Sequence, residues 1–396
     1  MPEALNQPLI RYLQPRSFLS FGPDFPGLEL RDLNVLVGAN GSGKSNLLEA
    51  INLLRAAPKE WREVTRKGGG VAEWIWKGEK KNGKARIEAL IANPSGQQAL
   101  RHAMAFHAVA QTFALDDERV EYEHPSPGKA QPDPFYRYQN GSPILRKEGK
   151  GQRILAPGII ESDRSILAQR RDPETYPELA WLAQSYEGIR IYREWAFGRG
   201  AVFREPQRAD MRNDVLEEDF SNLGLFLNRL KTRFPAAKKA IITGLKDLYD
   251  GIQDFDVFVE GGTVQVFVTE GDFSIPATRL SDGTLRYLCL LAILCDPDPP
   301  KLICIEQPEL GLHPDILPKV ADLLRSASER TQLIVTTHSD ILVDAMTVTP
   351  EAVVVCTKDQ GQTRMERLKA VDLGDWLKNY RLGQLWTKGE IGGTRW

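Results

Sequence analysis

Three glycines followed by a lysine and a serine form the most informative stretch of the sequence. Residues 38–45 fit the spacing G-x-x-x-x-G-K-S and lie between an aliphatic run at 33–37 and a stretch with helical spacing at 46–54. Glycines let the backbone come close to phosphate oxygens, and the first N–H groups of a helix attract an anion. In such a loop Lys44 reaches the β- and γ-phosphates and the Ser45 hydroxyl binds Mg²⁺. The spacing therefore predicts a site for a nucleoside triphosphate.

Two later apolar runs end in polar side chains that suit the same site. The run 302–305 is followed by Glu306, and the run 332–336 is followed by Thr337 and His338. Such runs are typical of buried parallel strands, whose carboxyl ends meet at one edge of a sheet. A carboxylate there holds Mg²⁺ through its waters, and a histidine donates a hydrogen bond to the γ-phosphate. Taken alone, Glu306 could equally cap a helix and His338 could be a satisfied core histidine.

The alternation of strands and helices around the phosphate loop predicts an α/β protein with a mainly parallel sheet. Other segments have the pattern of β-strands, namely 85–92, 103–115 and a hairpin over 136–145 that turns at Asn-Gly. Prolines and glycines at 125–133 mark a change in composition. We therefore expect one head made of residues 1–125 and 241–396, with residues 126–240 inserted as a lobe.

Length and composition exclude several classes of protein. A chain of 396 residues with 42% hydrophobic and 26% charged residues is typical of a globular protein with two or three domains. The apolar run 287–295 is too short to cross a bilayer, and the N-terminus lacks a basic segment followed by an apolar one. The four cysteines lie in apolar runs without CxxC spacing. We therefore expect a cytoplasmic protein with reduced cysteines, no secretion signal and no membrane partner.

Basic residues are concentrated in the middle of the chain. The net charge is −2, but residues 126–240 contain 20 Lys and Arg against 15 Asp and Glu, a balance of +5. Aromatic residues lie among them, and such a pattern can hold a nucleic-acid backbone. The alternative, which we favour, is that these arginines pair internally with acidic residues. The basic residues concerned are Arg146, Lys147, Lys150, Arg153, Arg164, Arg170, Arg171, Arg190, Arg193, Arg199, Arg204, Arg208 and Arg212.

The order of the motifs along the chain resembles that of the ABC-type ATPases. Residues 38–45 resemble the Walker A loop, and 302–307 resemble the Walker B strand. The turn LSDGT at 280–284 resembles the LSGGQ signature, residues 311–314 lie where the D-loop would, and His338 resembles the switch histidine. Motifs in this order are far more specific together than any one of them alone.

Within that superfamily the sequence is similar to the RecF-like branch, the AAA-family ATPases related to RecF, OLD nucleases and SMC heads. The matching segments are 33–54, 280–294, 305–314 and 334–344, and the tail 382–396 is typical of a stand-alone subgroup. The resemblance implies a P-loop NTPase of ABC/RecF type. Its core would be a mainly parallel sheet, with an antiparallel β subdomain and an inserted mixed α/β lobe.

The resemblance also implies the residues of an ATP site. Those that would bind the nucleotide are Gly38, Asn40, Gly41, Ser42, Gly43, Lys44 and Ser45, and Ser45 and Glu306 would hold Mg²⁺. In such heads the signature binds the γ-phosphate of the ATP held by the other subunit, here through Ser281, Asp282 and Gly283. Because the chain has one phosphate loop and one signature, the resemblance implies an ATP-dependent homodimer.

Two positions depart from the superfamily pattern. Asp282 stands where glycine is usual, and it adds a negative charge near a triphosphate unless it caps its helix. Gln307 stands where the catalytic glutamate is usual, and an amide orients the attacking water but cannot accept its proton. Either Glu309 serves as the base, or hydrolysis is slow and ATP acts mainly as a clamp, which we favour. The catalytic residues would then be Glu306, Gln307, Glu309 and His338.

The resemblance implies action on DNA, in repair or in defence against foreign DNA. The sequence after His338 contains no acidic nuclease cluster, so cutting would need a separate nuclease or effector partner. The alternative is a nucleotide-sensing scaffold that regulates an effector protein without binding DNA. A transporter ATPase subunit fits less well, because the lobe lacks a recognisable Q-loop and coupling helix.

Tryptophan is concentrated at the end of the chain. Trp376, Trp386 and Trp396 are three of the eight tryptophans and lie in the last 21 residues. We expect them to fold back onto the core, and the alternative is a docking surface for a partner.

Overall fold

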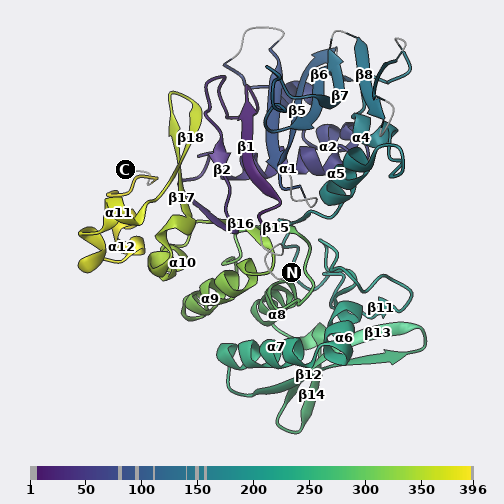
Figure 1. Cartoon of the computed structure of the whole chain (residues 1–396). Coiled ribbons are helices and arrows are strands. Elements are labelled where there is room, and N and C mark those ends of the chain that lie inside the picture. The colour runs from purple at the N-terminus through teal and green to yellow at the C-terminus, as the bar shows by residue number, and fades with distance from the viewer. Residues whose placement is uncertain are drawn as a thin grey trace.

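Three sheets organise the chain, and Figure 1 shows them one above another with helices between and beside them. The computed structural model describes residues 7–78, 83–93, 98–109, 112–139, 141–147, 151–155 and 158–393. The middle sheet carries the phosphate loop, so its strands and the helices on its two faces position most of the predicted site.

The middle sheet has six strands, and five of them are parallel. In spatial order they are β10 (Arg190–Tyr192), β15 (Leu302–Glu306), β16 (Gln332–Thr337), β3 (Leu33–Val37), β17 (Val353–Asp359) and β18 (Gln362–Arg367). Only β18 runs antiparallel to its neighbour. Every residue of β3 is buried, as expected for a central strand covered on both faces. The predicted mainly parallel sheet is confirmed.

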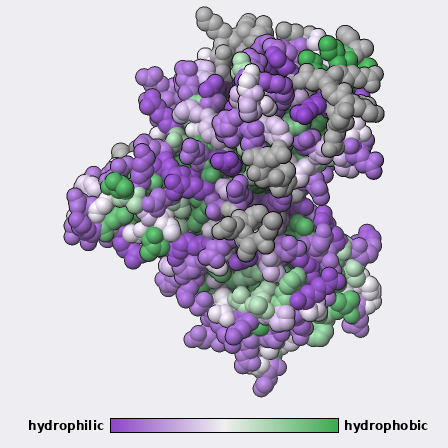
Figure 2. Space-filling model, in the orientation of Figure 1, coloured by the Kyte–Doolittle hydropathy of each residue, from purple (hydrophilic) through white to green (hydrophobic). Residues whose placement is uncertain are grey.

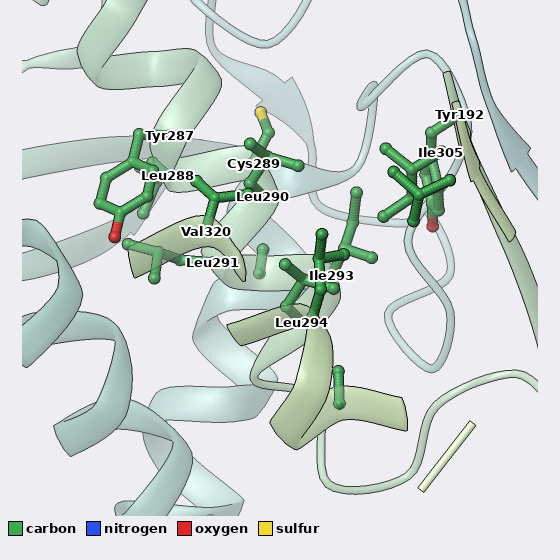
Figure 3. Packing of buried hydrophobic residues seen from close by; sticks show 14 of the residues in the cluster. Tyr192, Tyr287, Leu288, Cys289, Leu290, Leu291, Ile293, Leu294, Ile305 and Val320 are labelled. Atoms are coloured by element: carbon green, nitrogen blue, oxygen red, sulfur yellow. The ribbon is translucent and has the colours of Figure 1, made fainter. Parts of the chain in front are cut away.

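Successive residues of β3 enter two different cores, because side chains alternate between the faces of a strand. Leu36 packs with α1 (Lys44–Ala56), whereas Val35 and Val37 face α8 (Asp282–Leu294) and α9 (Leu317–Ser328). Figure 3 shows Leu288 and Leu291 of α8 close to Val320 of α9. Each fully buried leucine of this kind contributes roughly 2 kcal/mol of burial free energy. The two cores therefore cover both faces of the strand that leads into the phosphate loop.

The second sheet has eight strands, all antiparallel. They are β2 (Leu28–Glu29), β1 (Ile10–Arg16), β4 (Ala85–Ile91), β5 (Leu100–Val109), β6 (Thr112–Tyr122), β7 (Pro134–Gln139), β8 (Ser142–Lys147) and β9 (Gly151–Ile154), in spatial order. The helices between this sheet and the middle one include α1, α2 (Trp61–Lys67), α3 (Val71–Trp74), α4 (Ile166–Gln169) and α5 (Pro177–Glu187). This sheet is the expected antiparallel β subdomain. The single strand predicted over 103–115 is instead β5 and β6, because the chain reverses between Val109 and Thr112.

The third sheet is smaller and lies below α8 in Figure 1. Its elements are β11 (Gln207–Arg208), β12 (Ile252–Glu260), β13 (Thr263–Glu270) and β14 (Phe273–Pro276), with helices α6 (Leu223–Arg233) and α7 (Pro235–Leu248). Gly244 of α7 lets this layer approach α8 closely, since a Cβ there would lie 2.4 Å from Leu291 Cδ2.

Residues 126–240, expected to form one inserted lobe, contribute to all three sheets. The end of this segment enters the third layer through β11, α6 and the start of α7, whereas β7–β9 continue the eight-stranded sheet and β10 is an edge of the middle sheet. The predicted boundary at 125 lies between β6 and β7, which pair with each other. The prolines and glycines at 125–133 belong to the connection between these two strands.

The last described helix folds back onto the middle layer. Helix α12 (Leu382–Thr387) packs on α10 (Asp340–Ala345), and Trp386 is only 8% exposed. Trp376, next to α11 (Ala370–Leu373), is 44% exposed, and Trp396 lies outside the described residues. The expectation of folding back therefore holds for Trp386.

The hydrophilic surface and the free cysteine thiols are those expected from the composition of the chain. The face of the molecule in Figure 2 is mostly hydrophilic, with apolar residues in separate small patches. Among the described residues, no helix has both the length and the apolar character needed to cross a membrane. All four cysteines are free thiols, and burial raises the pKa of Cys295 to about 11.

Candidate functional site

The loop between β3 and α1 requires glycine at defined positions. A Cβ at Gly38 would lie 2.2 Å from the carbonyl oxygen of Cys356, and one at Gly43, where φ is 98°, would lie 2.0 Å from Thr363 Oγ1. Gly41 also has a left-handed φ of 77°, but apart from Gly41 and its two chain neighbours no atom of the described residues lies within 4 Å of its ideal Cβ position. Tight packing beneath the loop and open space at Gly41 suit a loop that receives a ligand from outside.

Lys44 points back into this loop. Its Nζ donates hydrogen bonds to the carbonyl oxygens of Gly38 (2.8 Å) and Ala39 (3.0 Å), and the residue is 5% exposed. Burial lowers the pKa of the Lys44 ammonium. The ammonium therefore lies at the loop with neutral carbonyl oxygens as its direct hydrogen-bond partners, where a phosphate would be a stronger partner.

Ser45 and Glu306 meet at the start of α1 and the end of β15. The Ser45 hydroxyl donates a hydrogen bond to Glu306 Oε1, although the two residues are 261 positions apart. A hydroxyl and a carboxylate are hard oxygen ligands of the kind that Mg²⁺ accepts together with water and phosphate oxygens. Among the described residues, no group of three or more His, Cys, Asp or Glu forms a metal site without a nucleotide. The pair fits a metal that is held mainly by its substrate.

Gln307 has an unusual backbone conformation at the end of β15. Its φ is 50°, in the left-handed region that non-glycine residues seldom adopt, and Pro308 follows it. Its N–H donates to the carbonyl oxygen of Thr336 at 2.9 Å, which ties the turn to the neighbouring strand. Strained backbone of this kind is concentrated at functional sites, where it fixes the direction of a side chain.

Glu309 anchors the turn that carries His338. Its Oε1 accepts hydrogen bonds from the Thr337 hydroxyl (2.9 Å) and from the His338 backbone N–H (2.8 Å). Its Oε2 is buried without a hydrogen-bond partner among the described residues. Burial raises the pKa of the Glu309 carboxyl, and the donors lower it only in part. With one oxygen committed to this turn, Glu309 acts first as a positioning residue for His338.

The signature turn begins α8 on the molecular surface. Ser281 is the N-cap, and its Oγ accepts from the Thr284 N–H at 3.1 Å. A Cβ at Gly283 would lie 3.2 Å from the carbonyl oxygen of Gly311, so the signature packs closely against the turn after β15. No hydrogen bond among the described residues joins residues 281–283 to the phosphate loop of the same chain. Within the described residues, the two predicted halves of the nucleotide site are therefore not bonded directly to each other.

The negative charge of Asp282 has a specific partner. Its Oδ1 accepts from the Arg204 guanidinium and from the N–H of Gly198 at 3.1 Å. The hydrogen bond from Arg204 lowers the pKa of the Asp282 carboxyl. Arg204 also donates to the carbonyl oxygens of Leu280 (2.8 Å) and Ala277 (3.1 Å), so one buried arginine holds the whole turn. Asp282 is therefore an anchor for the turn, with its charge offset by Arg204.

A sequence model of one protein family matches residues 33–344, and the family is described as "AAA domain, putative AbiEii toxin, Type IV TA system". This match spans every motif discussed above, from the phosphate loop to His338. The chain belongs to this AAA-domain family. No curated protein matches the sequence significantly.

Solved structures similar to this AAA-domain protein include head domains of SMC proteins. An SmcHead bound to the C-winged helix domain of ScpA has 16% identity and a TM-score of 0.59, covering 93% of this chain and 100% of the other. The Smc head from Pyrococcus furiosus, bound to the C-terminal domain of ScpA, has 14% identity and a TM-score of 0.57 over 94% and 99%. The head from Pyrococcus yayanosii has 13% identity and a TM-score of 0.52 over 94% and 99%. These likenesses confirm the ABC- and SMC-like P-loop ATPase fold.

Arg193 is a site residue that we did not predict. It follows β10, which runs parallel to β15, and its Nε lies 3.9 Å from Glu306 Oε2. Its Nη1 donates to Glu49, but Nε and Nη2 are buried without hydrogen-bond partners among the described residues. Arg193 was one of many basic residues in the sequence, and only the strand pairing shows that it reaches the carboxyl end of β15.

Residues 193–204, which we call the bridging segment, connect the two halves of the predicted site. At one end Trp195 Nε1 donates to the carbonyl oxygen of Glu306 at 2.6 Å. At the other end Arg204 holds Asp282. Between them, the guanidinium of Arg286 from α8 lies 4.3 Å from the ring centroid of Phe197. The bridging segment therefore contacts both the end of β15 and the start of the signature helix.

Several of the basic residues that raised the question of nucleic acid have acidic partners. These pairs are Arg164 with Glu60, Arg171 with Glu187, Arg193 with Glu49, Arg204 with Asp282, Arg208 with Asp210 and Arg212 with Asp214. Lys150 lies outside the described residues. Internal pairing, the alternative that we favoured, accounts for these six arginines.

Glu309→Gln is expected to remove a pH-dependent loss of stability. Because the folded carboxyl has a pKa above its usual 4.5, the folded chain keeps a proton that the unfolded chain releases as the pH rises past 4.5. Stability therefore falls with rising pH until the folded pKa is passed. We would measure the free energy of unfolding in urea between about pH 4 and about pH 8. Glu329→Gln, at an exposed position, is the control and should keep the slope of the wild type. An unchanged slope in Glu309→Gln would contradict the assignment.

Proposed function

We propose that the chain is an ATPase that closes as a homodimer around two ATP molecules. The observation that carries this proposal is the exposed, capped signature turn, which makes no hydrogen bond to its own phosphate loop within the described residues. A nucleotide bound to Lys44 in one copy can meet Ser281 of a second copy, where the N-terminus of α8 favours an anion. ATP then stabilises the closed state because it makes contacts there that the open state lacks.

The same proposal assigns roles within each nucleotide site. The phosphate loop from Gly38 to Gly43 and Lys44 bind the triphosphate, Ser45 and Glu306 hold Mg²⁺, and His338 faces the γ-phosphate. Gln307 orients the attacking water, but its amide cannot take the proton, so hydrolysis is slow. Bound Mg²⁺ would neutralise charge that develops on the phosphates. ATP in this scheme is a clamp that is released slowly.

The decisive experiment is the size of the protein in solution with and without ATP and Mg²⁺. We expect the mass of one chain without nucleotide and twice that mass with it. Ser281→Arg, which places a bulky side chain on the surface that would face the partner, should abolish the dimer and keep ATP binding by the single chain. Ser326→Arg, on the exposed side of α9, is the matched control and should still form the dimer. A wild-type chain that stays monomeric at saturating ATP would refute the proposal.

For the biological role we propose action on DNA, in repair or in defence against foreign DNA, together with a separate nuclease or effector protein. The family description names a toxin of a toxin–antitoxin system, which agrees with a defence role. Two of the similar SMC heads are bound to domains of ScpA, which supports the idea of a partner protein. DNA binding that requires ATP and falls steeply with salt would support this role, because phosphate contacts release counterions.

The internal pairing of six arginines favours the second candidate, a nucleotide-sensing scaffold that regulates an effector protein without binding DNA. Paired guanidinium groups offer less free charge to a phosphate backbone. If ATP still drives dimerisation but DNA binding is absent at low salt, the scaffold is the correct function.

A further inference from the structure

A cavity lies directly beside the signature turn. Its volume is about 610 Å³, which is in the range of small-molecule sites, and its lining includes Arg199, Arg204, Arg279 and Asp282. Glu205 is the other carboxylate in the lining. Since Asp282 already pairs with Arg204, the charges of Arg199 and Arg279 still lack an identified partner.

Arg199 and Arg279 carry charge that no ion pair in the described chain neutralises. Both are exposed, and neither forms an ion pair with any residue that the structure describes. Arg204 is 7% exposed, and its Nε is buried without a hydrogen-bond partner among those same residues. With three guanidinium groups against two carboxylates, the lining carries a net positive charge that attracts an anion, and guanidinium matches phosphate oxygens in a bidentate geometry.

The two arginines flank the signature from different elements. Arg279 ends the short helix Ala277–Arg279, two residues before the N-cap Ser281. Arg199 follows Gly198, whose N–H is bonded to Asp282. Arg204 fixes the backbone on both sides of Ser281, because it donates hydrogen bonds to the carbonyl oxygens of Ala277 and Leu280 and to the Asp282 carboxylate. The position of the cavity beside Ser281 is therefore built into the fold.

We propose that this cavity, the signature-side pocket, binds phosphate groups of a nucleotide through Arg199 and Arg279, and that this nucleotide is the ATP held by the partner copy. The inference rests on the proposed homodimer, which places a partner's triphosphate at Ser281. The two guanidinium groups then add charge-assisted hydrogen bonds that exist only in the closed dimer. They are positioned to determine how tightly ATP holds the two copies together.

The first test is the double variant Arg199→Ala/Arg279→Ala. Its dimer in Mg²⁺ and ATPγS, measured by analytical ultracentrifugation, should dissociate at least about tenfold more readily than the wild-type dimer, since charged hydrogen bonds are lost. ATP binding by the single chain should be unchanged. The control is Arg208→Ala/Arg212→Ala, two exposed arginines of the same region that are paired with Asp210 and Asp214. Arg199→Lys/Arg279→Lys should restore part of the loss.

The second test separates a partner-held nucleotide from a free one. Lys44→Ala removes the phosphate-loop lysine, and any weak ATP binding that remains should not depend on Arg199 and Arg279 if the pocket takes only the partner's nucleotide. Residual binding that disappears on adding Arg199→Ala/Arg279→Ala would instead assign a free nucleotide to the pocket.

An unchanged dimer in the arginine variant, with no arginine-dependent binding in Lys44→Ala, would overturn the proposal. The proposed homodimer has its own failure, a wild-type chain that stays monomeric with ATP. In that case the Lys44→Ala titration alone decides whether the pocket binds phosphate.

Discussion

Lys44→Ala is expected to weaken ATP binding by about 100-fold or more, which corresponds to about 2.7 kcal/mol. The ammonium of Lys44 lies among loop carbonyls at 2.8 and 3.0 Å, where it would exchange a neutral acceptor for a phosphate oxygen. Such a charge-assisted bond in a buried site is stronger than the bonds it replaces. Isothermal titration of ATP with Mg²⁺ into both proteins measures the difference directly.

The control for this prediction is Lys59→Ala, an exposed lysine after the end of α1. It removes the same charge from the protein without touching the loop, so its affinity for ATP should equal that of the wild type. Thermal unfolding of Lys44→Ala should remain close to that of the wild type, because the loop conformation depends on its glycines. ATP affinity that is unchanged in Lys44→Ala would mean that the nucleotide does not bind at this loop.

Gln307→Glu is expected to raise the rate of ATP hydrolysis by about 10²-fold to about 10⁴-fold, the usual contribution of general-base catalysis. The glutamate has the size of the glutamine and inherits the left-handed backbone at φ 50°. It therefore places a proton acceptor where the wild type has only an amide. Phosphate release under single-turnover conditions measures the chemical step without product dissociation.

Two further variants show which side chain orients or deprotonates the attacking water. Gln307→Ala should lower the slow wild-type rate, since the water loses its orienting group. Glu309→Gln should have a smaller effect, because Glu309 Oε1 is committed to Thr337 and to the His338 N–H. The reverse pattern, with no response at Gln307 and loss of hydrolysis in Glu309→Gln, would make Glu309 the base.

The phosphate loop and its two strands could be predicted because their signals are local. Gly38 and Gly43 are needed for the backbone itself, and the runs before Glu306 and His338 are apolar because both faces of their strands are covered. The hairpin over 136–145 was also predicted, since its turn lies within a few residues of its strands.

The predictions that needed correction all concerned segments whose structure depends on the strands with which they pair. The run 103–115 reads as one strand because both β5 and β6 are rich in strand-forming residues, and only their pairing shows the reversal between them. Residues 126–240 differ in composition from their surroundings, yet they pair with three separate sheets. The composition of a segment indicates how much apolar surface it can bury. It does not indicate which sheet the segment joins, because that depends on strands that are distant in the sequence.

The amino-acid sequence by itself determined the phosphate loop, the parallel strands that follow it and the acid and histidine at their ends. These features depend on backbone freedom, apolar runs and spacing, which act within a few residues. Only the tertiary structure decided that Arg193 reaches Glu306, that Arg204 holds Asp282 and that Arg199 and Arg279 share a cavity. Any of many arginines could have taken these places, because the contacts join residues about 80 or more positions apart and depend on how whole sheets and helices pack.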